Sequence, residues 1–107
     1  MVTTKLERQF DEAMMDIYRR AKREVGYNAS EFHNILDRNR GLITAKRLIN
    51  AKEVSIGYTN LHLLGRLDLT VEAVVYQNEK WHQLFETEEL ERSKKRLEDV
   101  GYKFRGE

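Results

Sequence analysis

The sequence predicts an all-α fold, a single compact domain of about five to seven helices with a long N-terminal helix and a well-capped C-terminal helix. Apolar residues recur at three- and four-residue steps, which is the period of an amphipathic helix. Proline is absent, so the strongest helix breaker is missing. Four single glycines follow apolar stretches, where a left-handed residue would end a helix: Gly26, Gly41, Gly65 and Gly101. We expect one domain over residues 1–107, with 103–107 frayed.

The first helix has the clearest pattern. Thr4 and Glu7 have the spacing of a capping box, and Lys22 and Arg23 suit the negative end of the helix dipole. Gly26 is expected to end the helix. The predicted inward stripe consists of Leu6, Phe10, Ala13, Met14, Ile17, Ala21 and Val25.

The next stretch predicts two shorter helices. Asn28 lies three residues before Glu31 and is expected to cap the first of them, with Tyr27 and Phe32 as a hydrophobic staple. This helix should stop near Gly41. A third helix then runs to about Asn50, with Leu42, Ala45, Leu48 and Ile49 on one side.

Residues 51–66 are ambiguous between helix and strand. The alternation of Val54, Ile56 and Tyr58 could begin a strand, whereas a helix from about Ser55 to Leu64 fits the later spacing better. A glycine inside that helix, at position 57, would cost about 1 kcal/mol relative to alanine. The choice at 51–58 stays open from sequence alone.

The C-terminal third predicts three further helical segments. Thr70 should cap a helix that runs through Tyr76, since an isolated strand there would have no partner. Residues 79–85 should form one or two more turns. Thr87 should cap the last helix, whose first turn holds Glu88 and Glu89 and which ends at Gly101.

Composition limits the classes of function. Nineteen basic and eighteen acidic residues give a formal charge of +1, which argues against coating nucleic acid by charge alone. There is no cysteine, so disulfides and thiolate chemistry are excluded. No apolar run is long enough for a membrane span, and residues 1–10 lack the pattern of a signal or transit peptide. We therefore expect a bacterial cytoplasmic protein without a membrane partner.

The sequence offers little for catalysis. None of the serines lies in a Gly-x-Ser-x-Gly elbow, and no glycine-rich phosphate loop is present. Glu79 and His82 have the Glu-x-x-His spacing of di-iron bundles, but the second such pair that those bundles require is missing. We expect no enzyme activity, no cofactor and no metal.

The favoured function is a non-catalytic interaction module that binds a protein partner or forms a homo-oligomer. Its surface would be an apolar and aromatic patch near residues 58–69 and 81–85. Arg66 and Asp68 could instead belong to a helix-entry loop in which the carboxylate bonds local backbone N–H groups. The candidate binding residues are Tyr58, Leu61, Leu63, Arg66, Asp68 and Trp81.

The alternative is an accessory domain that binds nucleic acid through a basic cluster in the middle of the chain. Two short helices joined by a turn have the outline of a helix-turn-helix. The connection over 50–55 is longer than usual for that motif and has no glycine. The cluster consists of Arg38, Arg40, Lys46, Arg47 and Lys52.

Five segments together resemble a family of small uncharacterised bacterial all-helical proteins of unknown function. They are GYNASEF (26–32), GLITAKRLI (41–49), GYTNL (57–61), GRLDLTVE (65–72) and LFETEEL (84–90). The resemblance covers nearly the whole chain, and GRLDLTVE is its most distinctive part. It implies a domain found alone or attached to larger proteins, and it supplies no functional residue.

Overall fold

A computed structural model describes residues 4–104, and every regular element in that range is helical. The all-α prediction is therefore confirmed, and the ambiguous stretch after Ser55 is helix. The Cα radius of gyration of 13.0 Å is that of one folded domain of about 100 residues. The elements are α1 (Lys5–Val25), α2 (Ser30–Asn50), α3 (Ile56–Leu63), η1 (Leu67–Leu69), α4 (Val71–Gln77), η2 (Glu79–Leu84) and α5 (Thr87–Asp99).

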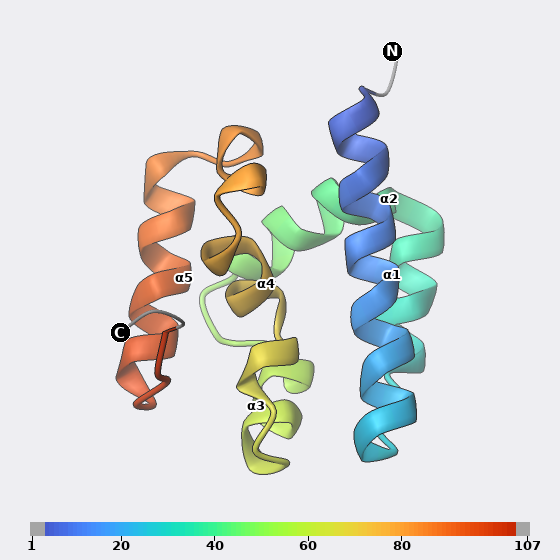
Figure 1. Ribbon diagram of the computed structural model, residues 1–107, viewed down its shortest axis with the longest axis vertical. Helices are drawn as coiled ribbons and strands as arrows, with labels where there is room; N and C mark the ends of the chain where they lie inside the picture. The colour runs from blue at the N-terminus through green and yellow to red at the C-terminus, as the bar shows by residue number, and fades with distance from the viewer. Residues whose placement is uncertain (1–3, 105–107) are drawn as a thin grey trace.

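The helices pack mainly in two pairs, α1 with α2 and α4 with α5, and α2 also contacts both α4 and α5. Figure 1 shows α1 and the first half of α2 side by side on the right, and α5 on the opposite side of the molecule. The second half of α2 turns away from α1 toward α4 and α5. Within 4–104, no helix combines the length and the apolar character needed to cross a bilayer.

Most of the predicted helix ends are confirmed. Thr4 and Glu7 form the expected capping box, and the hydroxyl of Thr70 accepts the Ala73 N–H at 3.1 Å. Glycines 26, 65 and 101 take the left-handed conformation that closes a helix.

Two predicted caps are wrong by one residue. Asn28 does not cap α2. The Tyr27 N–H still donates to the Ala21 carbonyl of α1, so the turn that closes α1 extends past Gly26, and the N-cap of α2 falls on Ala29. The cap of α5 is Glu86 rather than Thr87, in a box with Glu89. A carboxylate accepts the N–H groups of a first turn more strongly than a hydroxyl does, which favours the earlier start.

The expected break at Gly41 exists, but Arg40 supplies it. Arg40 has φ 67° and ψ 173°, so the two predicted helices are the two arms of a kinked α2. Gly41 lacks the predicted left-handed conformation and is buried against α1. The carboxylate of Asp11 accepts the Gly41 N–H at 2.7 Å and the Arg40 Nε–H at 3.0 Å, so a residue of α1 caps the second arm.

The main core lies between α1, α2, α4 and η2. Phe10 is fully buried, and its ring meets those of Trp81 and Phe85 edge to face at centroid distances of 5.2 and 5.6 Å. At the other end, Phe104 packs against the ring of Tyr76 at 5.4 Å. Of the stretch that is expected to fray, residues 103–104 belong to the described range and 105–107 lie outside it.

Candidate functional site

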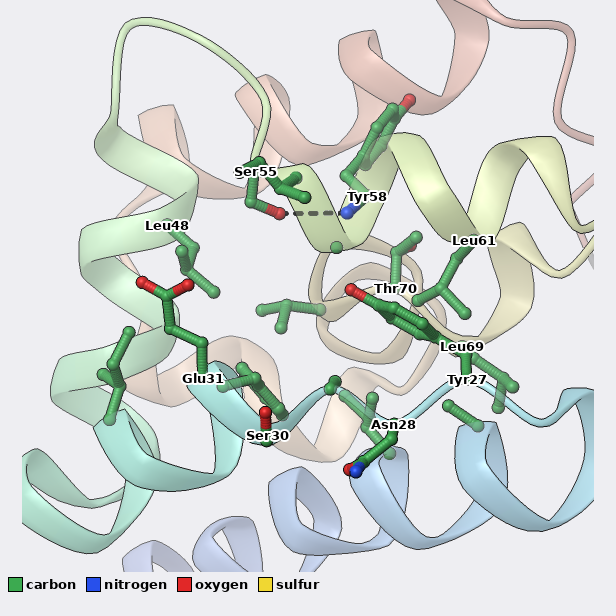
Figure 2. A pocket seen from close by; sticks show the side chains of 18 residues that line it. Tyr27, Asn28, Ser30, Glu31, Leu48, Ser55, Tyr58, Leu61, Leu69 and Thr70 are labelled. Atoms are coloured by element: carbon green, nitrogen blue, oxygen red, sulfur yellow. Dashed lines mark hydrogen bonds between the residues drawn. The ribbon is translucent and has the colours of Figure 1, made fainter.

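A cavity of about 350 Å³ opens at the surface beside the first arm of α2. We call it the α2 cavity. Figure 2 shows Leu48 and Leu61 on opposite sides of it, with the ring of Tyr27 between them. The floor and walls are mainly apolar, and their side chains come from Ile17, Ala21, Phe32, Leu48, Tyr58, Leu61, Leu69 and Val71.

Local sequence features hold the walls of the α2 cavity in place. The left-handed turn at Gly26 directs Tyr27 inward, and the Asn60 amide donates to the Tyr27 hydroxyl at 3.2 Å. Ser55 caps α3 by accepting the Tyr58 N–H at 3.0 Å (Figure 2). Tyr58 then reaches across to α5, where its hydroxyl donates to the Arg96 carbonyl. The wall is therefore anchored to helices on both sides.

The mouth of the α2 cavity carries a few polar groups. Figure 2 shows Ser30 and Glu31 at the edge, in the first turn of α2. Glu31 is the one Asp, Glu, Lys, Arg or His among the lining residues. Ile56 also lines the cavity while keeping 75% of its surface exposed. The mouth thus combines apolar surface with one carboxylate.

A second, more open depression adjoins the α2 cavity, and we call it the arginine hollow. Ile35 and Leu48 line both spaces, one from each arm of α2. The arginine hollow is otherwise polar, with Arg38 and Arg47 as its charged residues. Both arginines are exposed. The break at Arg40 brings these two cations together, because each arm of the kinked helix contributes one.

The six residues proposed for a partner surface lie in different environments. Tyr58 and Leu61 are only 4% exposed and form part of the cavity wall, while Trp81 is buried in the core against Phe10. Leu63, by contrast, is 78% exposed on the outer face of α3. The structure therefore brings two of the six to one cavity.

Arg66 and Asp68 are held in an ion-pair cluster with α1. Arg66 donates to Asp68 at 3.0 Å and to Glu24 at 2.7 Å, and Glu24 also accepts from Arg20 at 2.8 Å. Hydrogen bonds from Arg20 and Arg66 lower the pKa of Glu24 from 4.5 to about 2. The cluster fastens the loop after α3 to the end of α1, and both Arg20 and Arg66 are paired with carboxylates.

This cluster predicts a defined acid dependence of stability. The pKa of Glu24 is lower in the folded chain than in the unfolded one, so its contribution is present above pH 4.5 and is lost as the pH falls toward 2. We expect Glu24→Gln to be less stable than the wild type above pH 5 and equally stable near pH 2. Urea denaturation at several pH values measures the difference. A gap that stayed constant down to pH 2 would contradict the prediction.

The five cations of the predicted basic cluster are also divided. Arg40 pairs with Asp11, and the Lys46 ammonium lies 2.7 Å from Glu89. Lys52 lies in the loop between α2 and α3, in a depression beside α5. Arg38 and Arg47 alone share a surface, the arginine hollow.

A buried polar network was not predicted from the sequence. Glu72 is 1% exposed, and its Oε2 accepts from the Arg96 guanidinium at 3.0 Å. Burial raises the pKa of the Glu72 carboxyl, against the hydrogen bonds from backbone and from Arg96. Arg96 also donates to the carbonyls of Leu48 and Ala51, at the end of α2. The available signal was a lone glutamate inside the apolar run 71–75.

Among residues 4–104, no three His, Asp or Glu side chains are grouped so that they could hold a metal ion. The hydroxyl of Ser55 accepts a helix N–H, and that of Ser93 donates to the Glu89 carbonyl at 3.0 Å. Comparison with known proteins gives no match to this chain among family models, curated proteins or solved structures.

Proposed function

We propose that this chain is a non-catalytic interaction module that binds a protein partner by seating an apolar side chain in the α2 cavity. The observation that carries the proposal is the cavity itself. Its volume of about 350 Å³ lies in the usual range for ligand pockets, whereas packing voids in protein interiors rarely exceed a water molecule. It opens to the surface, so an apolar group could enter without unfolding the domain.

The surface around the mouth supports a partner that is itself a protein. Ile56 and Leu63 are separated by seven residues, so they lie on one face of α3, and both are largely exposed. Exposed apolar side chains beside an apolar pocket are typical of interfaces, where an anchor fills the pocket and neighbours exclude water. The same face would support the interaction favoured by the sequence, because Leu63 belongs to it and the predicted residues Tyr58 and Leu61 line the cavity.

Filling the cavity should abolish binding without harming the fold. A Cβ at Gly57 would point past Ser55 Oγ at 3.7 Å and Tyr27 Oη at 4.0 Å, which are ordinary contacts. Gly57→Leu should therefore place its side chain in the mouth. The probe is N-acetyl-phenylalaninamide, a single apolar side chain without charge. From its 15 heavy atoms at about 0.3 kcal/mol each we expect a Kd on the order of 1 mM for the wild type.

The measurement is an NMR titration of backbone amides in the full chain. We expect shifts at residues that line the α2 cavity in the wild type and a loss of binding of at least tenfold in Gly57→Leu. The matched control is Gly57→Ala, which leaves the cavity open and should raise the free energy of unfolding by up to about 1 kcal/mol. Shifts that are scattered over the surface, or that persist in Gly57→Leu, would refute the proposal.

A further inference from the structure

We propose that the partner segment is acidic, with a carboxylate next to its apolar anchor that pairs with Arg38 and Arg47 while the anchor fills the α2 cavity. This inference rests on the proposed function and identifies the class of partner. It follows from the two arginines that border the α2 cavity through Ile35 and Leu48.

Arg38 and Arg47 lie beside the α2 cavity, one on each arm of α2. Arg38 follows Ile35 by three residues on the first arm, so both lie on one face of the helix. Arg47 precedes Leu48 on the second arm. Because Ile35 and Leu48 also line the α2 cavity, a residue beside a seated anchor would meet the arginine hollow.

The guanidinium groups of Arg38 and Arg47 differ in their pairing from the neighbouring cations of the basic cluster. Arg40 and Lys46 are paired with Asp11 and Glu89, whereas the described residues provide no hydrogen-bonding or ionic partner for Arg38 or Arg47. Two such groups can bind a carboxylate through paired N–H donors. A bound acidic residue would therefore find a complementary charge that the chain itself does not neutralise.

Glu31 limits where a partner carboxylate can lie. In Figure 2 its side chain is beside Leu48 at the cavity mouth. Along the first arm Glu31 precedes Ile35 by four residues, whereas Arg38 follows Ile35 by three, so the carboxylate and the guanidinium lie about one turn to either side of Ile35. Repulsion by Glu31 therefore favours a partner carboxylate on the Arg38 side of Ile35, in the arginine hollow. Charge at the rim of an interface sets orientation and association rate in this way.

An acidic peptide fits this surface better than nucleic acid does. A phosphate backbone needs several unpaired cations along its path, and two of the five predicted cations are already neutralised. Asp37 is exposed next to Arg38, and Glu31 borders the cavity, so the local field is mixed. The apolar cavity beside the arginines also has no role in contacts with phosphates.

The test is a selection from a displayed library of random twelve-residue peptides on the immobilised full chain. We expect enriched peptides to carry a large apolar residue with Asp or Glu within about three positions on one side. An enriched peptide is then measured by fluorescence anisotropy. Arg38→Glu/Arg47→Glu should weaken its binding by about tenfold or more, and more at low than at high salt. Arg8→Glu, an exposed change on α1, should leave binding within twofold.

The outcomes separate the two levels of the proposal. Enriched apolar peptides without acidic residues, still lost in Gly57→Leu, would overturn the acidic partner and leave the interaction module standing. No enrichment, or peptides that bind equally well to Gly57→Leu, would overturn both. Tighter binding of a 20-base-pair DNA duplex, lost in Arg38→Glu/Arg47→Glu, would replace the peptide by nucleic acid.

Discussion

Replacing Glu72 by alanine is expected to lower the free energy of unfolding by about 3–5 kcal/mol. The carboxylate is 1% exposed and accepts from Arg96, whose guanidinium is itself mostly buried. Removal of the acid leaves that cation inside the protein with carbonyl partners only. The loss of stability comes from burying an unpaired charge, and it is larger than the net contribution of the Glu72–Arg96 ion pair to the free energy of unfolding.

The measurement is urea denaturation, in which the midpoint should fall while the slope of unfolding free energy against urea is unchanged. Glu91→Ala, an exposed change on α5, is the matched control and should stay within about 0.5 kcal/mol. The double variant Glu72→Leu/Arg96→Met should recover much of the loss, because it removes both charges. A loss below about 1 kcal/mol for Glu72→Ala would show that Arg96 is solvated in the native state.

The same ion pair also links stability to the candidate site. Arg96 donates to the carbonyls of Leu48 and Ala51, so it fastens the end of α2 to α4 and α5. Leu48 lies on this segment and lines both the α2 cavity and the arginine hollow. The buried network therefore sets the position of one wall of the site. Its sequence signal was a single glutamate among apolar residues, which a local pattern does not pair with an arginine 24 positions away.

Helices were predictable because their signals are local. The stripe of α1, its capping box at Thr4 and the cap at Thr70 each depend on residues within a few positions of one another. The α2 cavity is not local: its walls come from α1, α2, α3 and α4. Tyr58 and Leu61 were identified as candidates because the segment is rich in apolar residues. Sequence could not show that they would form a wall while Ile56 stayed exposed.

The arginine hollow, like the α2 cavity, depends on contacts between residues far apart in the sequence. Arg38 and Arg47 looked like two members of a uniform basic cluster, because sequence alone does not pair Arg40 with Asp11 or Lys46 with Glu89. Those pairs join residues 29 and 43 positions apart. Selecting the two available cations required the tertiary arrangement, and with it the break in α2.

That break depends on how closely α2 approaches α1 at Gly41. A Cβ at this position would lie 3.1 Å from the Asp11 Cα and 3.2 Å from Met14 Cγ. The first of these neighbours is backbone, so it cannot move aside as the tip of a side chain would. The glycine was predicted to end a helix by its left-handed conformation, and it is instead required by close packing.

Gly41→Ala is therefore expected to destabilise the domain by about 1–3 kcal/mol, because α1 and the second arm of α2 must separate to admit the methyl group. In thermal unfolding this corresponds to a fall in Tm of roughly 4–8 °C for each kcal/mol. Gly57→Ala makes the same chemical change in a helix with open space and should raise Tm instead. The opposite signs test the packing argument, since helix propensity alone would make both substitutions stabilising. A rise in Tm for Gly41→Ala would mean that the two helices have room to spare, and that the Asp11 cap rather than contact sets the position of the break.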